Sequence, residues 1–205
     1  MILKPIDQIT KADIDALITD KRAEIKTLEY KMKLPDRTDE PTKEFLADIS
    51  SFANAAGGDV IYGIEPAKDE NGKANGEPKA IAPLAGQNPD ETKLRLENSI
   101  RDGIAPKLSV QVKVIEGWET DSKGFVVLIR IPKSFAAPHM VTYKGTSRFF
   151  SRHSAGKCQL DVGEIRNAFL ATDSQAERIK RFREDRLAKI LADETPVRLS
   201  SPSRS

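Results

Sequence analysis

The sequence contains one cysteine, Cys158, and no apolar run long enough to cross a bilayer. A single cysteine cannot form an internal disulfide, and Cys158 has no companion at metal-ligand spacing, which fits a reducing compartment. The first ten residues carry Asp7 and lack the apolar core of a secretion signal. We therefore expect a cytoplasmic protein without a membrane partner.

Several motifs of active sites are also missing. The sequence has neither G-x-x-x-x-G-K-[ST] nor G-x-G-x-x-G, which are the usual signatures of nucleotide binding. His139 and His153 are its only histidines, and they form neither H-E-x-x-H nor H-x-E. The Gly57-Gly58 pair follows a predicted helix, where the dipole has the wrong sign for an anion. A turn that ends the helix is the better interpretation of this pair.

Charge of one sign does not dominate either. The formal net charge is +2, from 33 basic and 31 acidic residues, so any nucleic-acid surface must be local. One segment holds five basic or histidine side chains and no acid, a count that a solvated strand and loop would also give. These side chains are Lys144, Arg148, Arg152, His153 and Lys157.

Helical and extended patterns alternate along the chain. Apolar residues at helical spacing predict helices, and alternation or short apolar runs between Gly and Pro predict strands. Polar loops are expected at 33–40 and 67–79, and a short turn at 116–123 favours antiparallel neighbours. The helices are expected at 10–20, 41–56, 89–103, 162–170 and 175–194, and the strands at 25–31, 59–64, 110–114, 124–131 and 143–152.

This pattern predicts the α+β class, with a mixed, mostly antiparallel sheet flanked by helices. The length of 205 residues favours one domain, which we place at 1–172. A charged amphipathic C-terminal helix is expected at 173–194. The Ser- and Pro-rich segment 195–205 is expected to be disordered.

Glu24, Glu29 and Glu65 are the candidate site acids. Carboxylates suit hard cations such as Mg²⁺ or Mn²⁺, and a metal so held can activate water and neutralise a phosphate. A spacing of five brings Glu24 to Glu29 only if Glu24 lies where the first helix passes into the strand. Spacing alone favours surface acids paired with Lys21, Arg22 or Lys31, and Lys31 shares the strand face of Glu29.

Three blocks of sequence resemble the AlbA-2 domain of Schlafen-like proteins. They are Glu24-x-x-x-x-Glu29-Tyr30-Lys31, Phe52-Ala53-Asn54-Ala55-Ala56-Gly57-Gly58 and Val60-Ile61-Tyr62-Gly63-Ile64. Ile129-Arg130-Ile131-Pro132 and the basic residues up to Lys157 resemble the closing strands of that domain. The resemblance spans roughly residues 20 to 170 and implies a Schlafen AlbA-2-like lobe.

The resemblance implies that Glu24 and Glu29 match two acids of a metal-dependent RNA-cleaving triad, with Lys31 beside them. Glu65-Pro66 stands where the family places an Asp pair, so Glu65 is the expected third ligand of Mg²⁺ or Mn²⁺. Since the animal proteins use two such lobes, a homodimer is expected here. The expected partner is RNA, such as tRNA, or DNA, and the expected phosphate contacts are Lys31, Lys33, Lys144, Arg148, Arg152, His153 and Lys157.

Three functions remain open at this point. The first is a divalent-metal-dependent endoribonuclease. The second is a non-catalytic DNA- or RNA-binding module that directs a C-terminal effector domain missing from this sequence. The third is a nucleotide-binding regulator, which ranks last because the phosphate-loop motifs are absent.

Overall fold

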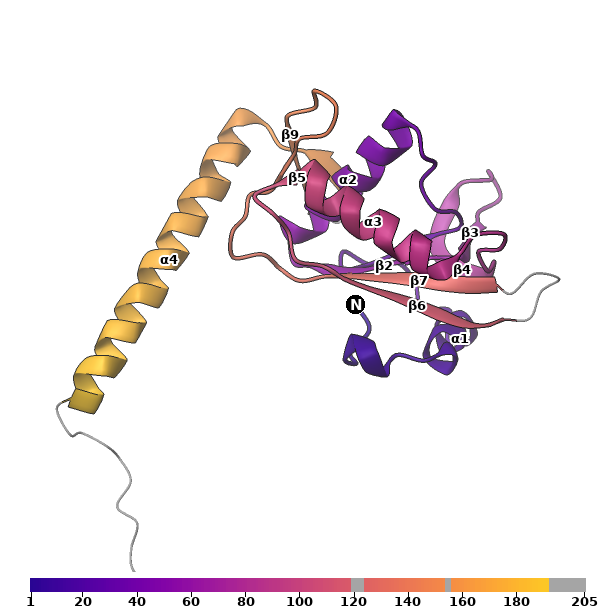
Figure 1. The fold of residues 1–205 in the computed structure, drawn as a ribbon, viewed down its shortest axis with the longest axis horizontal. Helices are drawn as coiled ribbons and strands as arrows, with labels where there is room; N and C mark the ends of the chain where they lie inside the picture. Colours follow the sequence, from indigo (N-terminus) through magenta and orange to yellow (C-terminus); the bar gives the residue numbers. More distant parts are fainter. Residues whose placement is uncertain (119–123, 154–155, 192–205) are drawn as a thin grey trace, which may run out of the picture.

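The computed structural model describes residues 1–118, 124–153 and 156–191, and it is built around a four-stranded sheet (Figure 1). The strand order is β1 (Leu28–Lys31), β2 (Gly58–Tyr62), β7 (Gly124–Ile131) and β6 (Gln111–Trp118). β1 pairs with β2 in parallel, and the other two pairs are antiparallel. The sheet is therefore mixed and mostly antiparallel, as the sequence predicts.

Both faces of this sheet are covered, which explains why β7 is apolar along nearly its whole length. α2 (Asp39–Ala53) and α3 (Pro89–Gly103) cover one face, where Phe125, Val127 and Ile129 join their core. A short 3-10 helix, η1 (Ile6–Gln8), and α1 (Lys11–Thr19) lie on the other face, where Val126 and Leu128 join a second core (Figure 1). Successive side chains of β7 thus point into opposite cores.

A second sheet and a hairpin surround this centre. The second sheet has the order β10 (Gly156–Gln159), β9 (Arg148–His153), β8 (Met140–Val141) and β5 (Ile104–Ala105). β3 (Ile64–Lys68) and β4 (Ala74–Ile81) form a separate antiparallel hairpin. Every residue from Phe45 to Ala53 in α2 is buried, because the central sheet and the second sheet both pack against this helix.

The segment after α2 locks the helix to the rest of the fold. The Asn54 side chain donates to the carbonyls of His139 and Phe150 at 2.9 and 2.8 Å and accepts from the His139 N–H at 2.7 Å. Gly57 then adopts a φ of +71°, and its backbone approaches the carbonyl of Ile131 closely. The Phe-Ala-Asn...Gly-Gly block is thus explained by packing and hydrogen bonding.

Gly57→Ala is expected to lower the free energy of unfolding by about 2–4 kcal/mol, from overpacking plus a left-handed backbone. An added Cβ would lie 2.5 Å from the Lys133 nitrogen and 2.6 Å from the Ile131 oxygen. Gly72→Ala is the matched control, because Gly72 has a φ of +78° but no atom within 4 Å of the added Cβ. Urea denaturation of both variants measures the difference, and equal losses would contradict the steric argument.

α4 (Val162–Leu191) leads away from the body of the protein (Figure 1). Its first third is attached by an edge-to-face contact between Phe149 and Phe169, whose ring centroids are 6.0 Å apart. The Thr172 hydroxyl also donates to the carbonyl of Ala137 at 2.6 Å. Within the described residues, no helix combines the length and apolarity that a membrane span requires.

Several predicted elements need correction. The helices expected at 162–170 and 175–194 form one continuous α4 up to Leu191, since 171–174 contains neither Gly nor Pro. β4 occupies most of the loop expected at 67–79, where pairing with β3 outweighs the polar composition. β1 starts at Leu28 rather than at residue 25, because a turn from Ile25 to Leu28 precedes it.

Another correction concerns β6, which extends through Trp118 into the turn expected at 116–123. The Trp118 indole N–H donates to the Asp15 carboxylate at 2.9 Å, and the Lys11 ammonium lies 5.3 Å from the ring centroid. These contacts with α1 hold the end of β6 against the protein. The rest of that turn, 119–123, and the tail expected at 195–205 lie outside the described residues.

Candidate functional site

Two of the candidate acids belong to the edge of the central sheet, where Glu24 precedes β1 and Glu29 lies within it. Leu28 and Tyr30 are buried on the α1 side of the sheet. Glu29 and Lys31 consequently point to the opposite face, as their alternation predicts. There they meet α2 and the β9–β10 hairpin through the ion pairs that follow.

Glu29 is held between two cations. Its Oε1 lies 2.6 Å from the Lys31 ammonium, and its Oε2 lies 2.5 Å from Nη1 of Arg152. The Arg152 contact is an ion pair without the alignment of a hydrogen bond, since Oε2 of Glu29 and Nε of Arg152 are buried without a hydrogen-bond partner in the described structure. The Arg152 guanidinium also lies 4.0 Å from the ring centroid of Phe52.

The charge cluster continues into α2. Asp48, which is 4% exposed, contacts the Lys31 ammonium at 3.2 Å and the Lys157 ammonium at 2.8 Å. Lys157 is also paired with Glu44. Burial alone lowers the pKa of Lys31, but the charges of Asp48 and Glu29 outweigh it and raise this pKa above its ordinary value. Lys31 therefore remains charged, and the cluster is internally neutralised.

Glu24 lies in the connection between α1 and β1, where the sequence places it. Its Oε1 accepts from the backbone N–H of Tyr30 at 2.6 Å, and its own N–H donates to the carbonyl of Gly76 in β4 at 2.6 Å. Burial raises the pKa of Glu24; the hydrogen bond from Tyr30 opposes the rise, and the charge of Glu29 adds to it. Two acids of the predicted triad are thus electrostatically coupled.

The raised pKa of Glu24 predicts a pH dependence of stability. Between the unfolded and folded pKa values the folded state binds more protons, so the free energy of unfolding falls as pH rises through that window. Glu24→Gln keeps an oxygen for the Tyr30 N–H and removes the titration. We expect this variant to exceed the wild type in stability at pH 7 and to match it below about pH 4. Urea denaturation across this range measures the effect, and parallel pH profiles would contradict it.

Glu65 lies on the β3–β4 hairpin. Its carboxylate pairs with the Lys79 ammonium at 2.8 Å, on the neighbouring strand. Across residues 1–118, 124–153 and 156–191, no three acidic, histidine or cysteine side chains are grouped so that they can hold a metal ion. Glu24 and Glu29 supply two carboxylates, and cations already contact both oxygens of Glu29. As they lie, these side chains do not fit the oxygen cage of Mg²⁺ or Mn²⁺.

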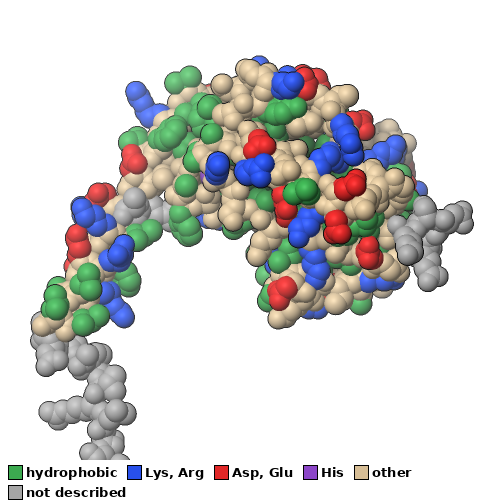
Figure 2. Space-filling view, in the orientation of Figure 1, with side chains coloured by type: hydrophobic (Ala, Val, Ile, Leu, Met, Phe, Trp, Pro, Cys, Tyr) green, Lys and Arg blue, Asp and Glu red, His purple; other side chains and the backbone are tan. Residues whose placement is uncertain are grey.

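The other basic residues of the predicted interface lie at the surface. Lys144 is 3.9 Å from Asp39, Arg148 donates to Gln159 at 3.2 Å, and His153 is 4.0 Å from Glu164. Lys33 is exposed just after β1. Figure 2 shows acidic and basic side chains interleaved on the visible face rather than a single basic field. The seven predicted contacts thus divide into an inward group, Lys31, Arg152 and Lys157, and an outward group, Lys33, Lys144, Arg148 and His153.

Sequence reasoning missed Glu44 and Asp48, which neutralise the inward group. Asp48 carried a signal, because it follows Phe45 by three residues and precedes Phe52 by four on the apolar stripe of α2. A charged residue on a buried helix face requires a partner. Glu44 carried no such signal, since its side chain is exposed.

Comparisons with known proteins give one family match and several similar structures. The family model described as Schlafen, AlbA_2 matches residues 24–161, about two thirds of the chain, and supports a nucleic-acid-binding domain. The chain is similar to the DIP2311 protein from Corynebacterium diphtheriae, with 18% identity and a TM-score of 0.43 over 73% of this chain and 26% of that chain. This chain therefore spans about a quarter of that protein.

A second similar structure is the N-terminal domain of a protein from Nitrosomonas europaea described as related to the ATP-dependent DNA helicase RecG. The identity is 16% and the TM-score 0.46, over 64% of this chain and 82% of that chain. No curated protein matches this chain.

Proposed function

This chain belongs to the Schlafen AlbA_2 family, and we propose that it binds nucleic acid through the outward-facing basic residues of the β8–β9 region. The family match over residues 24–161 carries the proposal. Lys144 lies in the turn that joins β8 to β9, Arg148 is the first residue of β9, and both side chains are exposed. Exposed cations suit phosphate contacts, because phosphates bind by releasing counterions and exchanging them for Lys and Arg.

A salt titration tests this interface. We expect the double variant Lys144→Gln, Arg148→Gln to bind labelled tRNA about 10-fold more weakly and to lower the slope of log K against log salt by about two. The matched control, Lys180→Gln with Arg183→Gln, removes the same charge from exposed positions of α4. If the control loses as much affinity as the double variant, the assignment to the β8–β9 region is wrong.

A finer candidate within this proposal is cleavage of RNA that depends on Mg²⁺ or Mn²⁺, as the sequence resemblance implies. The coupling of Glu24 to Glu29 favours it, because a cation between two carboxylates would relieve their repulsion. Metal binding would require the Glu29 carboxylate to leave Lys31 or Arg152. The test incubates the protein with labelled tRNA or DNA in Mn²⁺ or in EDTA. Product from RNA alone, and only with metal, supports the enzyme; no product supports a binding module.

The proposed assembly is a homodimer, since one chain supplies one lobe of a two-lobed cradle. α4 gives a second reason, because Ile179, Phe182, Leu187 and Ile190 on this projecting helix are each about half exposed or more. Light scattering across a range of protein concentrations would measure a dimer, and a monomer at all concentrations would contradict it. A cytoplasmic location and an additional C-terminal effector domain complete the proposal.

A further inference from the structure

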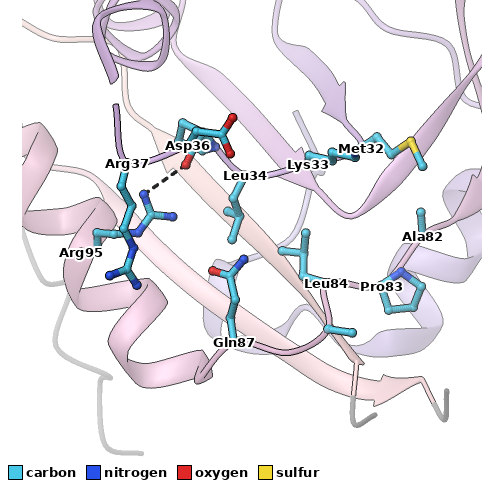
Figure 3. Close-up of a pocket in the computed structure, with 12 residues that line it drawn as sticks. Met32, Lys33, Leu34, Asp36, Arg37, Ala82, Pro83, Leu84, Gln87 and Arg95 are labelled. Carbon is cyan, nitrogen blue, oxygen red and sulfur yellow. Dashed lines mark hydrogen bonds between the residues drawn. The ribbon is translucent and has the colours of Figure 1, made fainter. Parts of the chain in front are cut away.

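A cavity of about 630 Å³ is lined by none of the candidate acids Glu24, Glu29 and Glu65. The connection from β1 to α2 forms one side, the connection from β4 to α3 forms another, and Arg95 of α3 closes one end (Figure 3). Its volume falls within the range of small-molecule sites. Neither the proposed phosphate surface on β8–β9 nor the Glu24–Glu29 pair lines it.

One end of the cavity is cationic. Figure 3 shows Arg37 and Arg95 side by side there. Nη1 of Arg95 donates to the carbonyl of Pro35 at 3.2 Å, while its Nε is buried without a hydrogen-bond partner in the described structure. Burial lowers the pKa of Arg95, and the charge of Arg37 lowers it further; nearby Tyr62 and Asp36 only partly offset this.

These cations differ from those of the charge cluster. Within the part of the chain that the structure describes, no carboxylate lies within 4.0 Å of the charged nitrogens of Lys33, Arg37 or Arg95. Lys31, Arg152 and Lys157 are all paired with acids. Asp36 also lines this end of the cavity but makes no ion pair with either arginine, so the two adjacent guanidinium groups keep forked donors that can recognise a phosphate.

The rest of the cavity is mostly apolar. Leu34 and Leu84 are 9% and 8% exposed, and Pro83 and Met32 continue this wall away from the arginines (Figure 3). Gln87 adds an amide that can both donate and accept hydrogen bonds. A ligand that fills both parts carries an anionic group at one end and a weakly polar group at the other.

We propose that this cavity binds a nucleoside monophosphate unit, with its phosphate on Arg37 and Arg95 and its base against Leu34, Leu84 and Pro83. The unit is either a free nucleotide or the 5′-phosphorylated end of a nucleic-acid strand. Arg37 and Arg95 are positioned by different elements, so the site forms only in the folded protein. The site is independent of the proposed β8–β9 interface, because neither Lys144 nor Arg148 lines the cavity.

Calorimetric titration of the full chain tests this site with five probes: adenosine 5′-monophosphate, adenosine, inorganic phosphate, an eight-nucleotide strand with a 5′-phosphate, and the same strand without it. The monophosphate is expected to bind at least 10-fold more tightly than adenosine or inorganic phosphate. Arg37→Gln is expected to weaken its binding at least 10-fold. Arg101→Gln, an exposed residue of α3 paired with Asp102, is the matched control and should leave binding unchanged.

The remaining outcomes distinguish a free nucleotide from a strand end and show which results would contradict the proposal. A strand end is identified if the 5′-phosphorylated strand binds more tightly than both the monophosphate and the same strand without its 5′-phosphate. Tighter binding of the monophosphate than of the phosphorylated strand identifies a free nucleotide. Equal binding of inorganic phosphate and the monophosphate overturns the nucleoside part. The site is overturned if neither the monophosphate nor the phosphorylated strand binds. It is also overturned if the Arg37→Gln variant folds and binds the monophosphate like the wild type. The β8–β9 double variant retains monophosphate binding, so the two proposals fail separately.

Discussion

Asp59→Ala is expected to lower the free energy of unfolding by about 3–5 kcal/mol, the cost of breaking a buried ion pair by removing one partner. Asp59 on β2 is fully buried, and its oxygens lie 2.8 and 3.0 Å from Nε and Nη2 of Arg130 on β7. It also accepts from the Ile2 N–H at 2.6 Å. The Arg130 guanidinium in turn donates to the carbonyls of Ile2 and Lys4. The alanine variant would leave this guanidinium uncompensated and release the N-terminal segment.

Urea denaturation followed by circular dichroism measures the loss. Asp102→Ala is the matched control, since Asp102 pairs with Arg101 at the surface, where water and salt screen the ion pair, and its removal should cost much less than that of Asp59. Asp59→Ala combined with Arg130→Met should recover part of the stability, because it removes the orphaned charge. A loss below about 1 kcal/mol for Asp59→Ala would show that the pair contributes no more than a surface ion pair.

The elements that the sequence predicts well are those with local signals. α3 spans Pro89–Gly103 as expected, since Asn88 accepts from the Glu91 N–H and Pro89 occupies the first turn. β7 follows from an apolar run between Gly124 and Pro132. β4 has no such signal, because its polar residues become a strand only by pairing with β3. The Asp59–Arg130 pair joins residues 71 positions apart, and no local pattern identifies it.

The candidate site likewise has features that local sequence signals predict and features that they do not. The position of Glu24 after α1 and the shared face of Glu29 and Lys31 both follow from local alternation and helix length. The pairing of Lys157 with Asp48 joins β10 to α2, and neither segment alone indicates the other. The stretch from Lys144 to Lys157 is free of acids in sequence but not in space. A basic run in sequence therefore overstates the exposed positive charge of a folded surface.

Glu29→Gln is expected to reduce metal-dependent cleavage of tRNA at least 100-fold if the proposed endoribonuclease activity is present, the range for a positioned acid or base. Binding of tRNA should be retained, because glutamine removes a negative charge and adds none that repels phosphate. The fold should tolerate this change, since Lys31 keeps its contact with Asp48 and Arg152 keeps the ring of Phe52. Thermal unfolding of the variant checks that point before any rate is compared.

Glu44→Gln is the matched control for this prediction. Glu44 belongs to the same charge cluster through Lys157, but its side chain is 68% exposed and contacts neither Glu24 nor Glu29. Both variants raise the net charge by one, so both should strengthen RNA binding slightly and equally, and only Glu29→Gln should lose cleavage. Cleavage that survives Glu29→Gln would remove Glu29 from the reaction. Equal loss in both variants would instead indicate that cleavage depends on the whole charge cluster rather than on one carboxylate. Lys157 pairs with both Glu44 and Asp48, and Asp48 contacts Lys31, which holds Glu29.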